Sequence, residues 1–419
     1  MKNLLAYLSI AASAMISLSC STGQPIRRQV LFECKDSASI PYRIPAIGAF
    51  GDGTLVALAD YRHCRSDIGF GRVDIRSRIS TDNGKTWGEE NIVVEGTGES
   101  GATDCGFGDP AVVCDRESSE VLLMLVCGET VYWQKTTNRQ NPNRVAMMRS
   151  VDKGRTWSEW TDMTENIYSL FDSCSKGCVQ SCFIGSGKIF QSRIVKAGDY
   201  YRIYAALCAR PNGNRVIYSD DFGRSWKALG GAEALPALKG NEPKCEELPD
   251  GRVILSSRAM GGRIFNIFSY TNQTTGEGSW GEASFSGKEN NGCIALDNSC
   301  NGEILIIPAT RKSDKKEVYL ALQSVPLGPE RANVGIWHKE LPADIDETGK
   351  ITPESLAADW SGPYQVSRDR SAYSTMEKQS DGKIGFFMEE TENADITGYN
   401  LVYMAIPADS LSLNNYSIR

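Results

Sequence analysis

The feature that most constrains the fold of this chain is a short motif that occurs three times at nearly constant spacing. The pattern is S-x-D-x-G-x-[ST]-W, with copies at residues 80–87, 150–157 and 219–226, whose tryptophans lie 70 and 69 residues apart. A degraded fourth copy, without the aspartate, ends at Trp280. The glycine permits the positive φ of a tight hairpin turn, and the aspartate can accept hydrogen bonds from backbone N–H groups of that turn. We therefore interpret the repeats as structural turns between strands.

A repeat of this length indicates an array of similar small sheets. Six four-stranded antiparallel blades would use residues 20–419 as a single domain, which predicts an all-β chain folded as a six-bladed β-propeller. Helical periodicity is weak, and we expect short helices only at 167–172 and 352–359. The segment 335–370 is long, and the sequence does not say what it builds.

The N-terminus has the pattern of an export signal. Residues 1–19 combine Lys2 with a short apolar run, as in a secretory signal peptide. Small residues before Cys20 resemble a bacterial lipoprotein signal, which implies acylation of Cys20 and a lipid anchor to a bacterial membrane. We therefore expect an exported monomer, either a periplasmic or cell-surface lipoprotein or a simply secreted protein.

Twelve cysteines remain after Cys20, an even number in a chain that we expect to be exported. Disulfides are typical of such proteins, so we expect them here, with pairing left open. Cys174, Cys178 and Cys182 form a C-x3-C-x3-C cluster. Its spacing fits no common zinc pattern, which favours a disulfide or free thiols over a metal site.

Composition excludes several classes of function. The formal net charge of −7 argues against a nucleic-acid binder, because such proteins need a basic face. Only two histidines occur, too few for a zinc site built from several histidines. The sequence shows no cofactor motif, and we predict neither a cofactor nor a metal.

The repeat resembles the Asp-box of sialidases, and Tyr42-Arg43-Ile44-Pro45 resembles their [FY]-R-I-P signature. The similarity extends over nearly all of residues 20–419. It implies a six-bladed propeller and hydrolysis of terminal sialic acids from glycoconjugates by a retaining mechanism with a covalent tyrosyl intermediate.

The carboxylate of sialic acid calls for arginine, which binds such a group in planar, bidentate geometry. Three arginines lie in contexts that resemble the family's triad. Arg43 is in the Y-R-I-P segment, Arg258 ends a buried strand after a D-G-R turn, and Arg331 follows Ser324-Val325-Pro326. Three basic residues just before the third position are alternatives to it: Arg311, Lys315 and Lys316.

A neutral tyrosine suits attack on a carbon that already bears a carboxylate, but it needs a base to remove its proton. Tyr373, within Ser371-Ala372-Tyr373-Ser374-Thr375-Met376, resembles the family's nucleophile. Glu242, 16 residues before Arg258, resembles its base, with Glu246 and Glu247 as rival carboxylates.

Asp67, 24 residues after Arg43, resembles the family's general acid, with Asp60 and Asp74 as alternatives. Glu389 resembles the residue that orients the first arginine. Asp109 resembles a residue that contacts a sugar hydroxyl, although a turn aspartate before proline explains it nearly as well.

Retaining exo-α-sialidase activity is the leading hypothesis. Transfer of the sialyl group to another sugar, or within the substrate, would use the same residues. A propeller that binds sialoglycans without catalysis is the alternative from another class, and it would have lost the acid, tyrosine or base.

Overall fold

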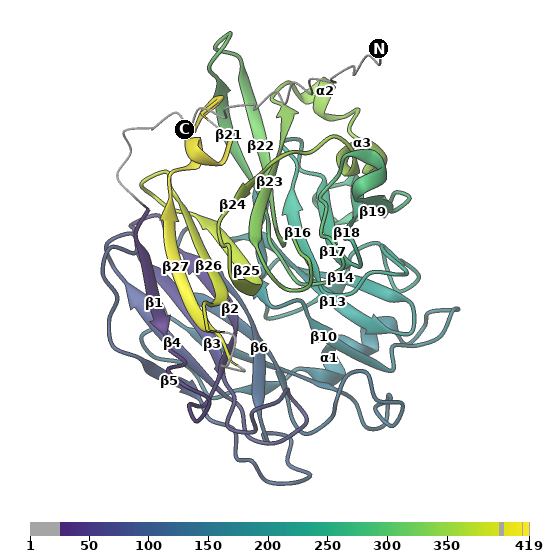
Figure 1. The fold of residues 1–419 in the computed structure, drawn as a ribbon. Helices are drawn as coiled ribbons and strands as arrows, with labels where there is room; N and C mark the ends of the chain where they lie inside the picture. Colours follow the sequence, from purple (N-terminus) through teal and green to yellow (C-terminus); the bar gives the residue numbers. More distant parts are fainter. Residues whose placement is uncertain (1–25, 394–397, 413, 419) are drawn as a thin grey trace, which may run out of the picture.

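The computed structural model describes residues 26–393, 398–412 and 414–418, and these residues form mostly β-strands with a few short helices. The strands make six small sheets, which are the blades of a β-propeller (Figure 1). The predicted fold class is therefore confirmed. No helix in the described ranges is long and apolar enough to span a bilayer. The predicted signal segment 1–19 and Cys20 lie outside those ranges.

The first three blades follow one another along the chain. The first contains β2 (Tyr42–Ala49), β3 (Leu55–Tyr61), β4 (Asp74–Ser80) and β5 (Asn91–Val94). The second contains β6 (Phe107–Cys114), β7 (Val121–Cys127), β8 (Arg144–Ser150) and β9 (Thr161–Asp162), with β11 (Gly187–Lys188) pairing in parallel with β6. The third contains β10 (Ser181–Ile184), β12 (Phe190–Ala197), β13 (Tyr200–Arg210), β14 (Gly213–Ser219) and β15 (Lys227–Ala228).

The remaining blades complete the ring. The fourth contains β16 (Pro243–Glu247), β17 (Val253–Ala259), β18 (Gly262–Asn272), β19 (Glu277–Trp280) and β20 (Ser284–Ser286). The fifth contains β21 (Ile304–Arg311), β22 (Glu317–Pro326), β23 (Val334–Pro342), β24 (Ser361–Gln365) and β28 (Tyr416–Ile418). The sixth contains β25 (Arg370–Lys378), β26 (Ile384–Thr391), β27 (Asn400–Ile406) and β1 (Arg28–Phe32).

Strand β1 closes the ring. It pairs antiparallel with β27, so that Arg28 lies opposite Met404. Figure 1 shows the purple β1 beside the yellow β27, at the edge of the sixth blade. The sixth blade thus combines the first strand of the described residues with three strands from near their C-terminal end.

Apolar runs in the sequence become strands that are buried on both faces. All seven residues of β7 are buried, because neighbouring blades cover both faces of this middle strand. The cores lie between blades as separate clusters, rather than as one central core. The axis itself is lined with polar and charged side chains, including the buried Lys244 and Glu303.

The three Asp-box copies are hairpin turns after the third strand of the first three blades, as predicted. In the first copy, Asp82 accepts hydrogen bonds from the backbone N–H and the hydroxyl of Thr86, at 2.9 and 2.6 Å. The same contacts recur at Asp152 and Asp221. Gly84 has a φ of 73°, the left-handed conformation that the turn requires.

The helices are few, and the two expected regions contain them. The expected helix at 167–172 overlaps α1 (Thr164–Tyr168) and η1 (Ser169–Phe171), and residues 352–359 include α3 (Pro353–Ala357). The other short helices are η2 (Lys288–Asn290), α2 (Ile345–Thr348) and η3 (Ala408–Ser412). The unexplained segment 335–370 builds β23, α2, α3 and β24. Its two strands belong to the fifth blade, and α3 packs on the fourth blade, where Trp360 stacks on Phe265 with ring centroids 5.6 Å apart.

The expectation of disulfides is wrong for this structure, because the twelve cysteines of the described residues are all free. Most of them are buried in different apolar clusters, such as Cys114 between the first two blades and Cys293 beside the fifth. They act there as small apolar core residues. The cluster of Cys174, Cys178 and Cys182 is likewise a set of free thiols, and the described residues contain no group of side chains arranged to hold a metal.

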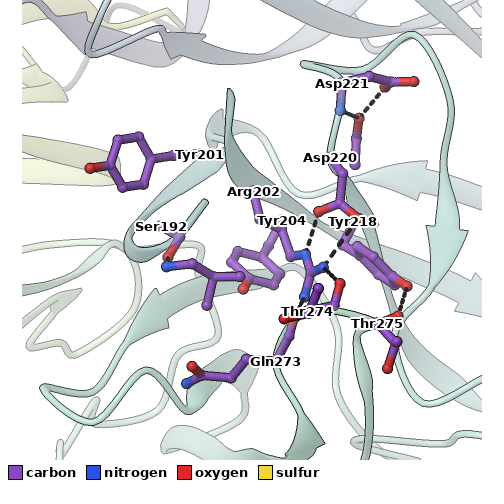
Figure 2. A network of polar contacts seen from close by, with 12 residues as sticks. Ser192, Tyr201, Arg202, Tyr204, Tyr218, Asp220, Asp221, Gln273, Thr274 and Thr275 are labelled. Carbon is purple, nitrogen blue, oxygen red and sulfur yellow. Dashed lines mark hydrogen bonds and ion pairs between the residues drawn. The ribbon is translucent and has the colours of Figure 1, made fainter. Parts of the chain in front are cut away.

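A buried arginine connects the third and fourth blades. Figure 2 shows Arg202 of β13, whose side chain is fully buried, donating to both carboxylate oxygens of Asp220 at 2.6 and 3.1 Å. It also donates to the carbonyl oxygens of Gln273 and Thr274, in the turn between β18 and β19. Its guanidinium carbon lies 4.5 Å from the centroid of the Tyr218 ring. Every side of this charge is therefore satisfied, as burial of a charge requires.

Candidate active site

A cavity of about 300 Å³ lies at one end of the propeller axis. Seven of the eight site residues predicted from the sequence line it: Arg43, Asp67, Asp109, Glu242, Arg258, Arg331 and Tyr373. The eighth, Glu389 of β26, is fully buried behind Arg43. The blades thus bring together residues that are up to 346 positions apart in the chain.

β-Bulges aim several of these side chains into the cavity. The register shifts lie between Arg43 and Ala46 in β2, between Gly108 and Ala111 in β6, and between Ser371 and Ser374 in β25. Such bulges re-aim side chains beside active sites. Ile44 and Asp109 have φ values of 56° and 52°, which are uncommon for residues other than glycine and mark local strain.

The three predicted arginines converge on Tyr373. The guanidinium carbons of Arg43 and Arg331 lie 5.7 and 5.5 Å from the centroid of its ring, and Arg258 donates to its hydroxyl at 3.2 Å. Glu389 accepts from Nε and Nη2 of Arg43 at 2.6 and 3.1 Å, which orients this arginine. In the described part of the chain Arg331 makes no ion pair, so its charge is available to a bound anion.

Arg311, an alternative to Arg331 in the sequence, lies elsewhere. It ends β21 and is paired with Glu340 and Asp314. Neither Arg311 nor the following lysines line the cavity.

Tyr373 and Glu242 form a short hydrogen bond. The tyrosine hydroxyl donates to Oε1 of Glu242 at 2.6 Å, while Arg258 donates to Oε2 at 2.7 Å. Burial raises the pKa of Tyr373 well above its ordinary value, and Glu242 raises it further, against the opposing effect of Arg258. The phenol is therefore neutral at rest and needs the neighbouring carboxylate to take its proton.

Strand alternation separates Glu242 from its two rivals. Side chains at every second position of a strand share a face, so Glu246 lies about 13 Å along the axis from Glu242. It is paired there with Arg193 at 2.5 Å. Glu247 points the other way, where it accepts from the hydroxyl of Ser192 and the backbone N–H of Arg193. Neither lines the cavity.

Asp67, Asp60 and Asp74 were the candidates for the general acid. Of these, only Asp67 lines the cavity, and 59% of its side chain is exposed. Nη2 of Arg62 lies 3.0 Å from Asp67 and 2.8 Å from Asp60, which is fully buried. Asp74 is buried and bound by Arg72, Arg76 and His63. Burial raises the pKa of Asp109 well above its ordinary value, and the charges of Asp67 and Asp60 raise it further.

Sequence reasoning missed Arg62 and the apolar wall of the cavity. Arg62 lies two residues after Asp60, and this D-x-R spacing at the end of a strand was a usable signal. The apolar wall comprises Ile68, Val126, Val131, Tyr132 and Phe183, with Trp133 exposed at the rim. Only the run Val131-Tyr132-Trp133, three apolar residues in a loop, stood out in the sequence.

Comparison with known proteins agrees with the propeller fold. Residues 53–385 match the BNR repeat-like domain. The chain is 29% identical over 374 residues to the sialidase of Micromonospora viridifaciens, covering 87% of this chain and 52% of that protein, so it spans about half the relative's length.

Among solved structures, the Hadza microbial sialidase Hz136 has a TM-score of 0.68 and 20% identity, covering 92% of this chain and 69% of that one. The intramolecular trans-sialidase from Ruminococcus gnavus has a TM-score of 0.64 and 18% identity, covering 92% and 98%. At such identities these structures show a shared fold. The chain therefore belongs to the BNR repeat-like domain family, and its relatives in sequence and in fold are sialidases, in agreement with the resemblance carried by its Asp-boxes and Y-R-I-P segment.

Proposed function

We propose that this protein is a retaining exo-α-sialidase that releases terminal sialic acids from glycoconjugates. The observation that carries the proposal is the hydrogen bond of 2.6 Å from the Tyr373 hydroxyl to Glu242, within a ring of three arginines. A phenol paired with a base, beside concentrated positive charge, is suited to a substrate whose reacting carbon bears a carboxylate.

Binding comes first in this mechanism. Arg43, Arg258 and Arg331 hold the carboxylate of the sugar, and the arginine that Glu389 fixes loses little freedom on binding. Asp109, which lines the cavity, contacts a hydroxyl of the sugar ring in this proposal, and the apolar wall covers an uncharged substituent. Water is thereby displaced from around the reacting carbon, which strengthens the electrostatic contacts there.

Two displacements follow. Asp67 donates a proton to the glycosidic oxygen while the Tyr373 hydroxyl transfers its proton to Glu242 and its oxygen bonds to the anomeric carbon. The aglycone leaves with the proton from Asp67. Asp67 then accepts a proton from water, which attacks the same carbon and displaces the tyrosine oxygen, and Glu242 returns the proton to that oxygen. Two inversions give retention.

Turnover of an activated aryl sialoside tests the activity. Tyr373→Phe should lower kcat by at least ~10³-fold, because the nucleophilic oxygen is removed. Tyr200→Phe is the matched control, since the Tyr200 hydroxyl donates to Glu120 at 2.6 Å outside the cavity and should not affect turnover. An inactive wild-type protein, or a Tyr373→Phe variant with normal turnover, would overturn the proposal.

The alternatives predict different products. A trans-sialidase would give sialyl-lactose when lactose is added in excess, and an intramolecular one would release an anhydro sugar. A binding propeller would retain sialoglycans without releasing sugar. Following the anomeric configuration of the first product by NMR separates retention from inversion.

We further propose export of the protein, with acylation of Cys20 as the anchor. The support is the sequence of residues 1–20 alone. Labelling with a radioactive fatty acid tests it: the wild-type protein should incorporate label and Cys20→Ala should not. A wild-type protein that is secreted without label would favour simple secretion.

A further inference from the structure

A second and larger cavity, of about 570 Å³, lies at the other end of the propeller axis. Its wall includes Ala49 at the end of β2, Cys114 at the end of β6 and Lys378 at the end of β25. Arg43, Asp109 and Tyr373 lie near the opposite ends of the same three strands. At about 3.3 Å per residue, the two cavities are separated by roughly 15–20 Å.

The wall of this second cavity is basic. It carries four basic side chains, Arg116, Lys188, Arg193 and Lys378, and one carboxylate, Glu377. We call it the distal basic cavity. Lys188, which is nearly fully buried, lies 3.3 Å from Glu377, and Arg193 is paired with Glu246 behind the wall.

Arg116 is a basic side chain of this wall that has no carboxylate partner in the described part of the chain. Among the described residues it makes no ion pair, and its guanidinium carbon lies 5.0 Å from the centroid of the Tyr201 ring. Partial burial lowers the pKa of Arg116, and the charge of Arg193 lowers it further, against the opposing effect of Glu247 and Glu377. Burial and the charge of Arg193 also lower the pKa of Lys378. The charge of Arg193 therefore repels those of Arg116 and Lys378 beside an open space, although Arg193 itself is paired with Glu246 and Glu247.

We propose that the distal basic cavity binds a small ligand through an oxyanion group, a carboxylate or a phosphate, separately from the site around Tyr373. A guanidinium group binds such groups through two parallel hydrogen bonds, and the anion would relieve the repulsion between Arg116 and its basic neighbours. The volume is within the range of small-molecule sites. Phe190, Leu305 and Ile306 give part of the wall an apolar character, which suits a ligand with a carbon skeleton of monosaccharide size.

Calorimetric titration of the full chain with inorganic phosphate and, in a second arm, with D-glucuronate tests the proposal. Saturable binding of either probe is expected, and which probe binds identifies the type of oxyanion. Arg116→Gln should weaken this binding at least about tenfold, as loss of a charge-assisted hydrogen bond implies. Arg116→Lys should recover part of it.

Arg331→Gln is the matched control, because it removes an arginine from the other cavity and should leave the distal binding unchanged. Arg116→Gln should in turn keep the turnover of the wild type, which also shows that the variant is folded. The proposal is overturned if neither probe binds saturably, if Arg116→Gln binds as tightly as the wild type, or if Arg331→Gln abolishes binding.

Discussion

Replacing Glu389 with glutamine tests how the site is held together. Its two carboxylate oxygens accept four hydrogen bonds: Oε1 from Nε of Arg43 and the backbone N–H of Ile44, at 2.6 and 2.8 Å, and Oε2 from Nη2 of Arg43 and the backbone N–H of Tyr373, at 3.1 and 3.2 Å. A glutamine amide has one oxygen and one NH₂ group. In either orientation, the NH₂ group of the glutamine would lie opposite two N–H donors and could accept a hydrogen bond from neither.

The expected cost can be worked out from these contacts. One charge-assisted bond is lost, one buried backbone N–H is left unsatisfied, and Arg43 loses the opposing charge of a fully buried carboxylate. Together these effects should lower the free energy of unfolding by about 3–5 kcal/mol. Because Arg43 is no longer fixed, the KM for a sialoside should also rise by about tenfold or more.

Urea unfolding and steady-state kinetics measure both effects. Glu340→Gln is the matched control, since Glu340 also accepts two bonds from one arginine, Arg311, but both side chains are about one-third exposed. That change should cost less than about 1 kcal/mol and leave KM unchanged. If Glu389→Gln behaved like this control, the carboxylate would not be what positions Arg43.

The Asp-box turns and the thiols provide three simpler tests. Burial alone would raise the pKa of Asp82, but hydrogen bonds from Thr86 lower it to about 2. The stabilising contribution of this carboxylate is therefore present above pH ~4 and is lost as the pH falls towards 2. In acid unfolding, the stability of Asp82→Asn should fall less steeply with pH than that of the wild type, and equal slopes would contradict this. Gly84→Ala should lower the free energy of unfolding by about 3 kcal/mol, because at a φ of 73° its Cβ would collide with the Tyr403 hydroxyl. Gly382→Ala, also at positive φ but with open space around it, should cost less in the same urea titration, and equal costs would argue against the collision. Dithiothreitol should not change the midpoint of urea unfolding, because all twelve described cysteines are free, and a fall in the midpoint would reveal a disulfide.

The sequence was informative where a local motif identifies a residue. The length of the repeat predicted the number of blades, and its turn pattern predicted their hairpins, since the three intact copies make the same contacts within eight residues. Arg43 and Tyr373 lie in distinctive segments, and both line the cavity. Glu242 was harder to distinguish from Glu246 in the sequence, because the two differ in how far along the propeller axis their side chains lie.

Other features depend on tertiary packing and have no local signal. Phe183 and Tyr132 meet in the cavity wall with ring centroids 4.6 Å apart, although they belong to different blades. The prediction of disulfides failed for another reason. That prediction rested on the even number of cysteines and on the expected export of the protein. In the structure, the thiols instead pack as small apolar side chains between sheets. The roles of the site residues remain predictions for kinetics to test.

The pairing of β1 with β27 has a consequence for how the protein folds during synthesis. Arg43 comes from the blade that follows β1, whereas Glu389 and Tyr373 come from the blade that β1 completes. During synthesis, β1, the first strand of the described residues, must wait for β27 before the seam between these two blades can form. A nascent chain that has not yet exposed β27 would carry several finished sheets and a divided candidate site. If the proposed activity is correct, it should appear only after β27 has emerged and paired with β1.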